Sequence, residues 1–234
     1  MNPQENIWWS TEIRGKYTVL KDYIKSDERP DYNRSVTLTT QGTYGYLYHI
    51  EVLCRRWDGH ISVAVYCPGH DFNTAINLIY YLRQCKDSCV KRKTSWHFVY
   101  NTIYSPQSNI SFPNSYINHM NISCDNSFED VLKKYKKSFR SSNSLTYPIN
   151  VVRNVARLNT RTEYVFASDI ELYPSLGIVP AFLDLIDREK SGLVPMISRN
   201  KSHVYVFPVF EVEETVEPPM TKPELIQLLK SGDY

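Results

Sequence analysis

Tyr147-Pro-Ile-Asn-Val-Val-Arg-Asn-Val-Ala156, followed by Tyr164-Val-Phe-Ala-Ser-Asp-Ile-Glu-Leu-Tyr-Pro174, is the most informative part of this sequence. After Tyr147-Pro148, apolar side chains recur at helical spacing, which predicts a helix. Residues 163–168 have an apolar and aromatic centre, Tyr164 to Ala167, and they predict a buried strand that ends just before Asp169. A helix that leads into a buried strand is a building unit of α/β folds.

The rest of the chain continues this alternation of strands and helices. Further strands are expected at residues 36–40, 61–66, 96–100 and 203–212. Further helices are expected at residues 47–54, 71–82, 128–137, 176–186 and 221–230. Asp71 can cap the second of these helices, and Thr221 with Glu224 forms a capping box for the last. The pattern predicts an α/β domain with a Rossmann-like, mostly parallel sheet and with strand 163–168 at its centre.

The domain boundaries follow from composition. Residues 1–34 are polar and aperiodic, so we expect an N-terminal arm outside the core, and we place the domain at residues 35–234. Residues 101–127 are rich in Asn, Ser and Pro, which is typical of a long surface loop.

Composition excludes several classes of protein. The chain has 234 residues, 42% of them hydrophobic, so it can bury a core. A net charge of +2 is too small to indicate a nucleic-acid partner. No Gly-x-Gly-x-x-Gly, Walker loop, Gly-x-Ser-x-Gly or His-Glu-x-x-His motif is present. The 18 tyrosines suit either a half-buried sheet or a surface that contacts sugars or proteins.

Features of the sequence that bear on its cellular compartment disagree with one another. The sequence has no apolar run long enough to span a membrane, and residues 1–10 lack the features of a signal peptide. Glycosylation sequons, which have meaning only in the secretory pathway, begin at Asn33, Asn109, Asn121 and Asn200. The five cysteines have no zinc-binding spacing, and they allow either two disulfides with one free thiol or five buried thiols.

Asp169 and Glu171 are the candidate metal ligands. They lie two residues apart at the end of the predicted strand, so alternation would point both carboxylates to the same side. In open α/β sheets, ligands bind beyond the carboxyl ends of the strands, where clustered carboxylates suit a hard divalent cation. An acid-x-acid triplet is common, however, and Glu211-Val-Glu213 is another. The polar residues of the preceding helix, Asn150, Arg153 and Asn154, favour a site for a phosphorylated ligand over a plain strand end.

These segments resemble glycosyltransferase family 49. The family pattern runs Tyr-Pro, Asn, Arg-Asn-x-Ala, then an apolar strand and an Asp-x-Asp motif followed by Pro. This sequence matches the pattern at Tyr147, Pro148, Asn150, Arg153, Asn154, Ala156, Asp169, Glu171 and Pro174. Segments 36–41, 57–66, 206–211 and 221–225 are similar as well, in the same order, so the resemblance covers about residues 35–230.

The resemblance implies a GT-A fold and inverting transfer of a sugar, first of all glucuronate, from a UDP-sugar donor to a glycan acceptor on a glycoprotein. It also implies Mn²⁺ held by Asp169 and Glu171, and a nucleotide that lies near Thr39, Thr40 and Gln41. Asn150, Arg153, Asn154 and Asp169 complete the donor site by the same likeness. It further implies localisation in the Golgi lumen, as part of a type II membrane protein if the chain is longer than the sequence given.

This sequence departs from the family pattern in two ways. Glu171 replaces the second Asp of the motif, and a Glu still ligates hard cations. Only 63 residues follow Glu171, whereas family members continue through an acceptor side and a late His ligand. We therefore expect a C-terminally truncated domain with little or no transferase activity, and we assign no catalytic base. The alternatives are β-1,3-N-acetylglucosaminyl transfer, or a non-catalytic paralogue that binds nucleotide sugar, glycan or a partner glycosyltransferase.

Overall fold

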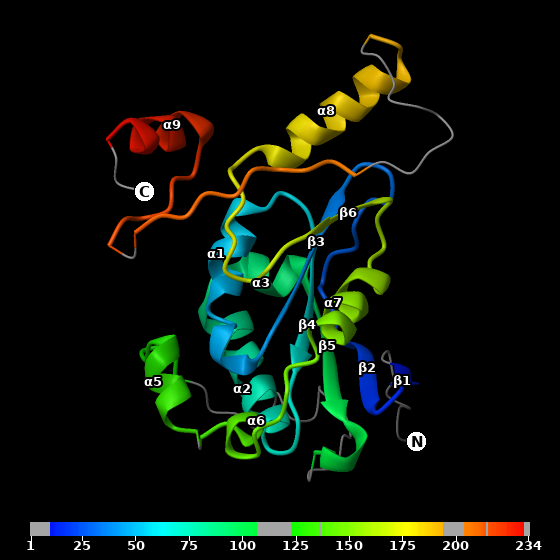
Figure 1. The fold of residues 1–234 in the computed structure, drawn as a ribbon, viewed down its shortest axis with the longest axis vertical. Helices are drawn as coiled ribbons and strands as arrows, with labels where there is room; N and C mark the ends of the chain where they lie inside the picture. Colours follow the sequence, from blue (N-terminus) through cyan, green and yellow to red (C-terminus); the bar gives the residue numbers. More distant parts are fainter. Residues whose placement is uncertain (1–9, 107–122, 136, 194–203, 214, 232–234) are drawn as a thin grey trace, which may run out of the picture.

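The structure is a computed structural model that describes residues 10–106, 123–135, 137–193, 204–213 and 215–231. Its centre is a six-stranded sheet with the strand order β1-β2-β5-β4-β3-β6 (Figure 1). The strands are β1 (Ser10–Arg14), β2 (Tyr17–Ile24), β3 (Val36–Gly42), β4 (Ile61–Tyr66), β5 (Thr94–Asn101) and β6 (Tyr164–Ala167).

Four of the strands are parallel to one another. β3 pairs with both β4 and β6, and β4 pairs with β5, all in parallel, whereas β2 joins β5 and β1 in antiparallel fashion. The expected α/β domain with a mostly parallel, Rossmann-like sheet is therefore confirmed. The expectation that strand 163–168 is central is wrong, because β6 lies at the edge of the described sheet and pairs only with β3.

Helices cover both faces of the sheet. The α-helices are α1 (His49–Arg56), α2 (Asp71–Cys85), α3 (Ser88–Lys93), α5 (Phe128–Lys133), α6 (Phe139–Ser142), α7 (Ile149–Leu158), α8 (Ile178–Lys190) and α9 (Lys222–Ser231). Short 3₁₀ turns are η1 (Tyr44–Tyr46) and η2 (Thr102–Tyr104). Figure 1 shows α7 on one side of the central strands and α1, α2 and α3 on the other.

The alternation of side chains along β4 explains this arrangement. Val63 and Val65 belong to the large core cluster under α1, α2 and α3, whereas Ala64 and Tyr66 belong to a smaller cluster under α7. All six residues of β4 are buried, as expected for a strand covered on both faces.

The N-terminal segment corrects the expectation of a polar arm. Residues 10–24 form a hairpin, β1 and β2, that extends the sheet beyond β5. Val19 is fully buried and Leu20 is 1% exposed, so β2 is part of the core. Polar residues that suggested an arm lie on both strands, where Glu12 of β1 pairs with Arg14 of β1 and Lys21 of β2.

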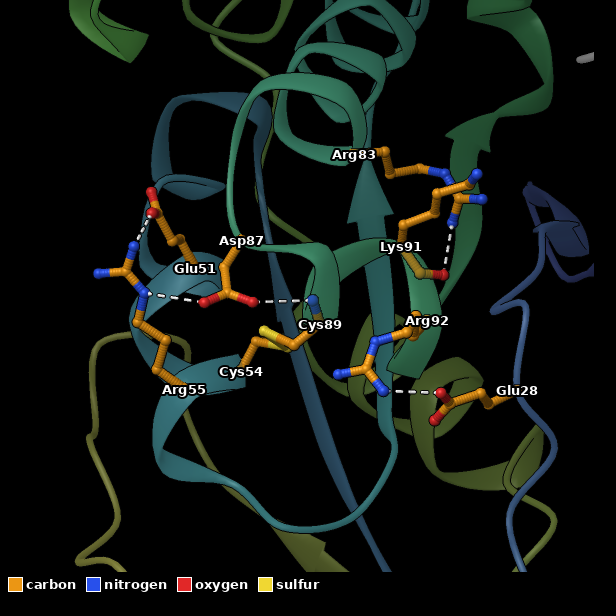
Figure 2. The surroundings of a disulfide bond; sticks show 9 residues. All are labelled: Glu28, Glu51, Cys54, Arg55, Arg83, Asp87, Cys89, Lys91 and Arg92. Atoms are coloured by element: carbon orange, nitrogen blue, oxygen red, sulfur yellow. Dashed lines mark hydrogen bonds and ion pairs between the residues drawn. A yellow bond between two sulfur atoms is a disulfide. The ribbon is translucent and has the colours of Figure 1, made fainter.

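Two disulfides link the helices of the larger layer. Cys54 of α1 is bonded to Cys89 of α3, and Cys85 at the end of α2 is bonded to Cys124. Figure 2 shows Asp87 beside the first of these bonds, between Arg55 and the backbone N–H of Cys89. Cys67 is buried and free, so the alternative of two disulfides with one thiol is confirmed.

The C-terminal part lies beyond one end of the sheet in Figure 1. Residues 204–213 are mostly exposed and form no strand in the structure, so the strand expected at 203–212 is wrong over its described part. Arg56, which is 5% exposed, fastens this region to α1 by donating to the carbonyl oxygens of Pro218 and Pro219. Within the described residues, none of the helices has the length and apolar character needed to cross a membrane.

Candidate functional site

Helix α7 runs antiparallel to β4, so its first turn lies at the carboxyl end of the sheet. At that end, the rings of Tyr147 and Tyr66 pack edge to face with centroids 5.8 Å apart. At the opposite end, the Ser62 hydroxyl donates to the carbonyl oxygen of Ala156 over 2.8 Å. The polar residues that begin α7 therefore lie where α/β sheets bind their ligands.

The parallel pairing of β6 with β3 places Asp169 beside the end of β3. The N–H of Ser168 donates to the carbonyl oxygen of Thr39 over 3.1 Å, and this bond aligns the two chains. Gln41 lies two residues after Thr39 and Asp169 one residue after Ser168, and Gln41 Nε2 donates to Asp169 Oδ1 over 3.0 Å. Asp169 thus lies beside the end of the strand predicted at residues 36–40.

Arg153 joins this pair from α7. Its Nη2 atom forms an ion pair with Asp169 Oδ1, so Gln41 and Arg153 share one carboxylate oxygen. Burial alone would raise the pKa of Asp169, but the hydrogen bonds from Arg153 and Gln41 outweigh it and lower the pKa below its ordinary value. Asp169 is therefore ionised at neutral pH, and the described residues bring no donor to its second oxygen, Oδ2.

The acidic motif itself corrects the sequence interpretation. β6 ends at Ala167, and Asp169 to Leu172 form a turn closed by the Leu172 N–H and the Asp169 carbonyl oxygen at 3.1 Å. The motif is not the alternating end of a strand. Ile170 is buried, with its Cδ1 atom 3.4 Å from the place that a Cβ atom on Gly42 would take, and Glu171 is exposed.

Tyr147 is the centre of the candidate site. Its hydroxyl is buried and has no hydrogen-bond partner among the described residues. Burial raises the pKa of Tyr147 most, the charges of Asp169 and Glu171 raise it further, and those of Arg153 and Arg140 lower it. Two carboxylates and two guanidinium groups therefore surround one unsatisfied phenol. This is an environment suited to a polar, charged ligand.

Two further unsatisfied oxygens lie at the end of β3. The side-chain oxygen of Gln41 and the hydroxyl of Thr40 are both buried without a partner in the described chain. The alternation of β3 puts Thr40 on the face of Leu38, which is under α1, and Gln41 on the opposite face with Asp169. The structure thus brings Gln41 into the cluster and keeps the Thr40 side chain out of it.

Of the remaining predicted residues, Thr39 is buried in β3, whereas Asn150 and Asn154 lie on α7. Asn150 and Asn154 are one helical turn apart, and both are exposed, as is Arg153. Sequence analysis missed the central position of Tyr147 and did not select Arg140. Tyr147 begins the Tyr-Pro pair at which the sequence matches the family pattern, whereas Arg140 stands in a serine-rich stretch that gives no comparable signal.

An aromatic surface lies on the other side of Glu171. Tyr46 and Tyr48, which follow β3, are 54% and 46% exposed, and both rings lie against His49. His49 Nδ1 is 2.6 Å from the hydroxyl of Tyr173. Burial lowers the pKa of His49, and the negative charge of Glu171 opposes that effect. The charge of Glu171 thus acts on Tyr147 of the charged cluster and also on Tyr48 and His49, next to exposed tyrosines of the kind that stack on apolar faces of ligands.

The donor set fits a hard divalent cation that is shared with a ligand. Asp169 Oδ2 and the exposed Glu171 offer carboxylate oxygens, which are the ligands preferred by such ions. Among the described residues, no group of three or more His, Cys, Asp or Glu side chains is placed to hold a metal. A cation here would therefore take its other ligands from phosphate oxygens and water.

Comparison with known proteins identifies the family of this chain and several relatives. The family model described as "Glycosyl-transferase for dystroglycan" matches residues 35–234. Beta-1,4-glucuronyltransferase 1 of Danio rerio is 30% identical over 94% of this chain and 51% of its own length, and the Bos taurus protein of that name is 23% identical over 95% and 51%. The xylosyl- and glucuronyltransferase LARGE2s of Danio rerio is 24% identical over 92% of this chain and 22% of its own.

The chain spans about half the length of the glucuronyltransferases it matches. The matched region includes all residues of the cluster around Tyr147. The chain belongs to the glycosyltransferase family for dystroglycan, glycosyltransferase family 49.

Proposed function

We propose that this chain binds a UDP-sugar and transfers its sugar, glucuronate or a related one, to a glycan acceptor with inversion of configuration. The observation that carries the proposal is the cluster of Gln41, Arg153 and Asp169 around the unsatisfied hydroxyl of Tyr147, at the carboxyl end of the sheet. Relatives that share this region are named as glucuronyltransferases, which supports the choice of sugar.

The donor side of the reaction follows from the cluster. The exposed amides of Asn150 and Asn154 and the guanidinium of Arg153 offer donors to a nucleotide or its phosphates, and Gln41 offers a free oxygen to a ribose hydroxyl or base. We propose that Asp169 and Glu171 hold Mn²⁺. Such an ion would neutralise the charge that develops on a departing nucleoside diphosphate.

The acceptor side is proposed to be the surface of Tyr46 and Tyr48. A glycan stacked there would have its hydroxyls close to Glu171 and to the donor sugar, and positioning of this kind supplies much of the rate enhancement in transfer reactions. The two disulfides suit an oxidising compartment, which supports a place in the Golgi lumen.

The experiment measures UDP binding by titration calorimetry with and without Mn²⁺. Asp169→Asn and Glu171→Gln remove one negative charge each, and we expect each to weaken Mn²⁺-dependent UDP binding by about tenfold or more, the range seen when metal ligation is disturbed. Glu211→Gln is the matched control, because Glu211-Val-Glu213 has the same spacing and Glu211 is exposed away from the sheet.

Donor hydrolysis and transfer to a glycan are measured beside binding. The expectation of little transfer by this chain alone is tested there and is separate from the binding result. UDP binding that ignores Mn²⁺ and both substitutions would contradict the donor site. The same loss in Glu211→Gln would show that the effect comes from net charge and not from the cluster.

A further inference from the structure

Arg140, on α6, is a second arginine next to Tyr147. The carboxylate of Asp71 holds the start of α6 in place. Asp71, which is 2% exposed at the start of α2, accepts hydrogen bonds from the Ser138 hydroxyl at 2.8 Å and from the N–H groups of Phe139 and Arg140 at 2.7 and 3.1 Å. Asp71 was expected to cap its own helix. Instead, its carboxylate caps the short helix that carries Arg140, and this ties that residue to the carboxyl end of β4.

The guanidinium group of Arg140 has donors that the described residues leave unused. Its Cζ atom is 5.8 Å from the centroid of the Tyr147 ring, a cation–π arrangement. Its Nε atom is buried without a hydrogen-bond partner, and no carboxylate of the described chain forms an ion pair with it. Arg153, on the other side of Tyr147, is already paired with Asp169. Arg140 is therefore the cation of this cluster that lacks an anion.

Two unsatisfied donors thus belong to one contacting pair of side chains, the Arg140 guanidinium and the Tyr147 ring. The Tyr147 hydroxyl and the Arg140 Nε–H are both buried, and the charge of Arg140 lowers the pKa of Tyr147. The planar fork of a guanidinium matches the two oxygens of a phosphate or carboxylate. An apolar or neutral ligand would leave these donors unpaired, whereas an anion would satisfy both at once.

We propose that Arg140 and the Tyr147 hydroxyl form an anion site that binds an acidic group of the sugar nucleotide, either its diphosphate or the carboxylate of a uronate sugar. The proposal rests on the proposed function, since it places this site within the same donor pocket. It assigns Arg140 the part of a ligand-binding residue, in addition to Arg153, which is paired with Asp169.

The test compares four ligands that differ in their anionic groups: uridine, UDP, UDP-glucose and UDP-glucuronate. Binding of each to the unsubstituted chain, Arg140→Met, Arg140→Lys and Tyr147→Phe is followed by ligand-observed NMR titration in the presence of Mn²⁺. Arg157→Met is the matched control, because Arg157 is an exposed arginine on α7 with no ion pair in the described structure. Thermal unfolding of each variant checks that the fold is retained.

We expect Arg140→Met to weaken at least one charged ligand by tenfold or more while uridine binding stays the same. Arg140→Lys should recover part of the loss, since it keeps the charge but not the fork, and Tyr147→Phe should lose less. Equal loss for UDP, UDP-glucose and UDP-glucuronate assigns the site to the diphosphate. Loss confined to UDP-glucuronate assigns it to the uronate carboxylate.

Three results would overturn the inference. Unchanged binding of every ligand by Arg140→Met would show that the guanidinium is not a ligand-binding group. A loss as large for uridine as for UDP, or the same loss in Arg157→Met, would indicate a structural or general charge effect. Failure of the unsubstituted chain to bind any uridine ligand would overturn the proposed function, and this inference with it.

Discussion

His97 makes the stability of this fold depend on pH in a window that can be calculated. The ring of His97 is fully buried on β5, and its hydrogen bonds join β5 to β2 and β4. Its Nδ1 atom accepts the N–H of Asp22 at 2.8 Å, so the neutral ring carries its proton on Nε2, which lies 3.0 Å from the Ser62 hydroxyl. That hydroxyl in turn donates to Ala156 at the end of α7. A second proton would have to be placed on Nδ1, against the backbone N–H.

Burial lowers the pKa of His97 from 6.5 to about 4, although the nearby charge of Asp22 opposes the change. Between these two pH values the unfolded chain binds a proton that the folded chain does not bind, so stability falls as pH falls through the window. At about 1.4 kcal/mol for each pH unit of difference, the loss is roughly 3 kcal/mol by pH 4 and does not grow below it. Burial lowers the pKa of His49 and His60 too, so they add in the same direction.

Urea unfolding at a series of pH values between about 7 and 4, followed by tryptophan fluorescence, measures this loss. Between these pH values, the free energy of unfolding of His97→Gln should fall by roughly 3 kcal/mol less than that of the unsubstituted chain. Ser62→Ala is the control, because it weakens the network at every pH but leaves the titrating ring in place. NMR titration of the His97 ring in the unsubstituted chain reads the pKa directly. An equally steep pH dependence in His97→Gln, or a ring that titrates near 6.5, would refute the reasoning.

Three further predictions concern the framework around the site. Gly69 has a φ of +55°, and a Cβ atom there would lie 2.7 Å from the Phe139 ring. Gly69→Ala should therefore destabilise the fold by about 2 kcal/mol or more, measured by thermal unfolding. An unchanged melting temperature would contradict this contact. Replacing Cys85 and Cys124 together by serine opens a loop of 39 residues. The chain-entropy argument predicts that the free energy of unfolding, measured in urea, falls by about 4 kcal/mol, and a fall of under about 1 kcal/mol would count against it. Arg56→Met removes both hydrogen bonds to the carbonyl oxygens of the prolines before α9. Limited proteolysis should therefore cut near residues 215–221 faster than in the unsubstituted chain. Equal rates of cleavage would show that other contacts hold this segment.

The sequence predicts the central strands well because their physical signal is local. Residues 61–66 are apolar apart from Ser62, and a strand covered on both faces is expected to be nearly so. Residues 164–167 look similar in sequence but form an edge strand, in which Tyr164 and Phe166 are half-buried and Val165 is exposed. Phe166 gains its partners, Trp57 and Phe207, from distant parts of the chain, and no periodicity reveals them.

The two wrong assignments at the ends of the chain have opposite causes. In β2, Lys21 and Asp22 interrupt an otherwise apolar strand, so polarity hid a core element. In residues 204–213, alternating valines suggested a strand, yet Val204 and Val206 are both 86% exposed and the segment pairs with no strand in the described chain. Alternation predicts which side chains share a face, but a strand also needs a neighbour to bond with.

The candidate site is predictable only in part for the same reason. Gln41 and Asp169 could be brought together from sequence because each follows a predicted parallel strand, and Arg153 because its helix precedes one of them. Arg140 reaches the site through a hydrogen bond to Asp71, which is 69 residues earlier in the chain. A contact of that range depends on how the completed layers pack, and no short motif encodes it.

The two disulfides overlap along the chain, and this changes what a protease can do to the molecule. Any peptide bond between Cys89 and Cys124 lies outside the loop closed by Cys54 and Cys89 but inside the loop closed by Cys85 and Cys124. Hydrolysis there leaves Gln41 on one fragment and Asp169 on the other, with a covalent bridge between them. The fragments would migrate as one species until a reductant is added, and each would hold the other at an effective concentration on the order of millimolar. The cluster around Tyr147 can therefore survive a cut in the backbone that joins its two halves.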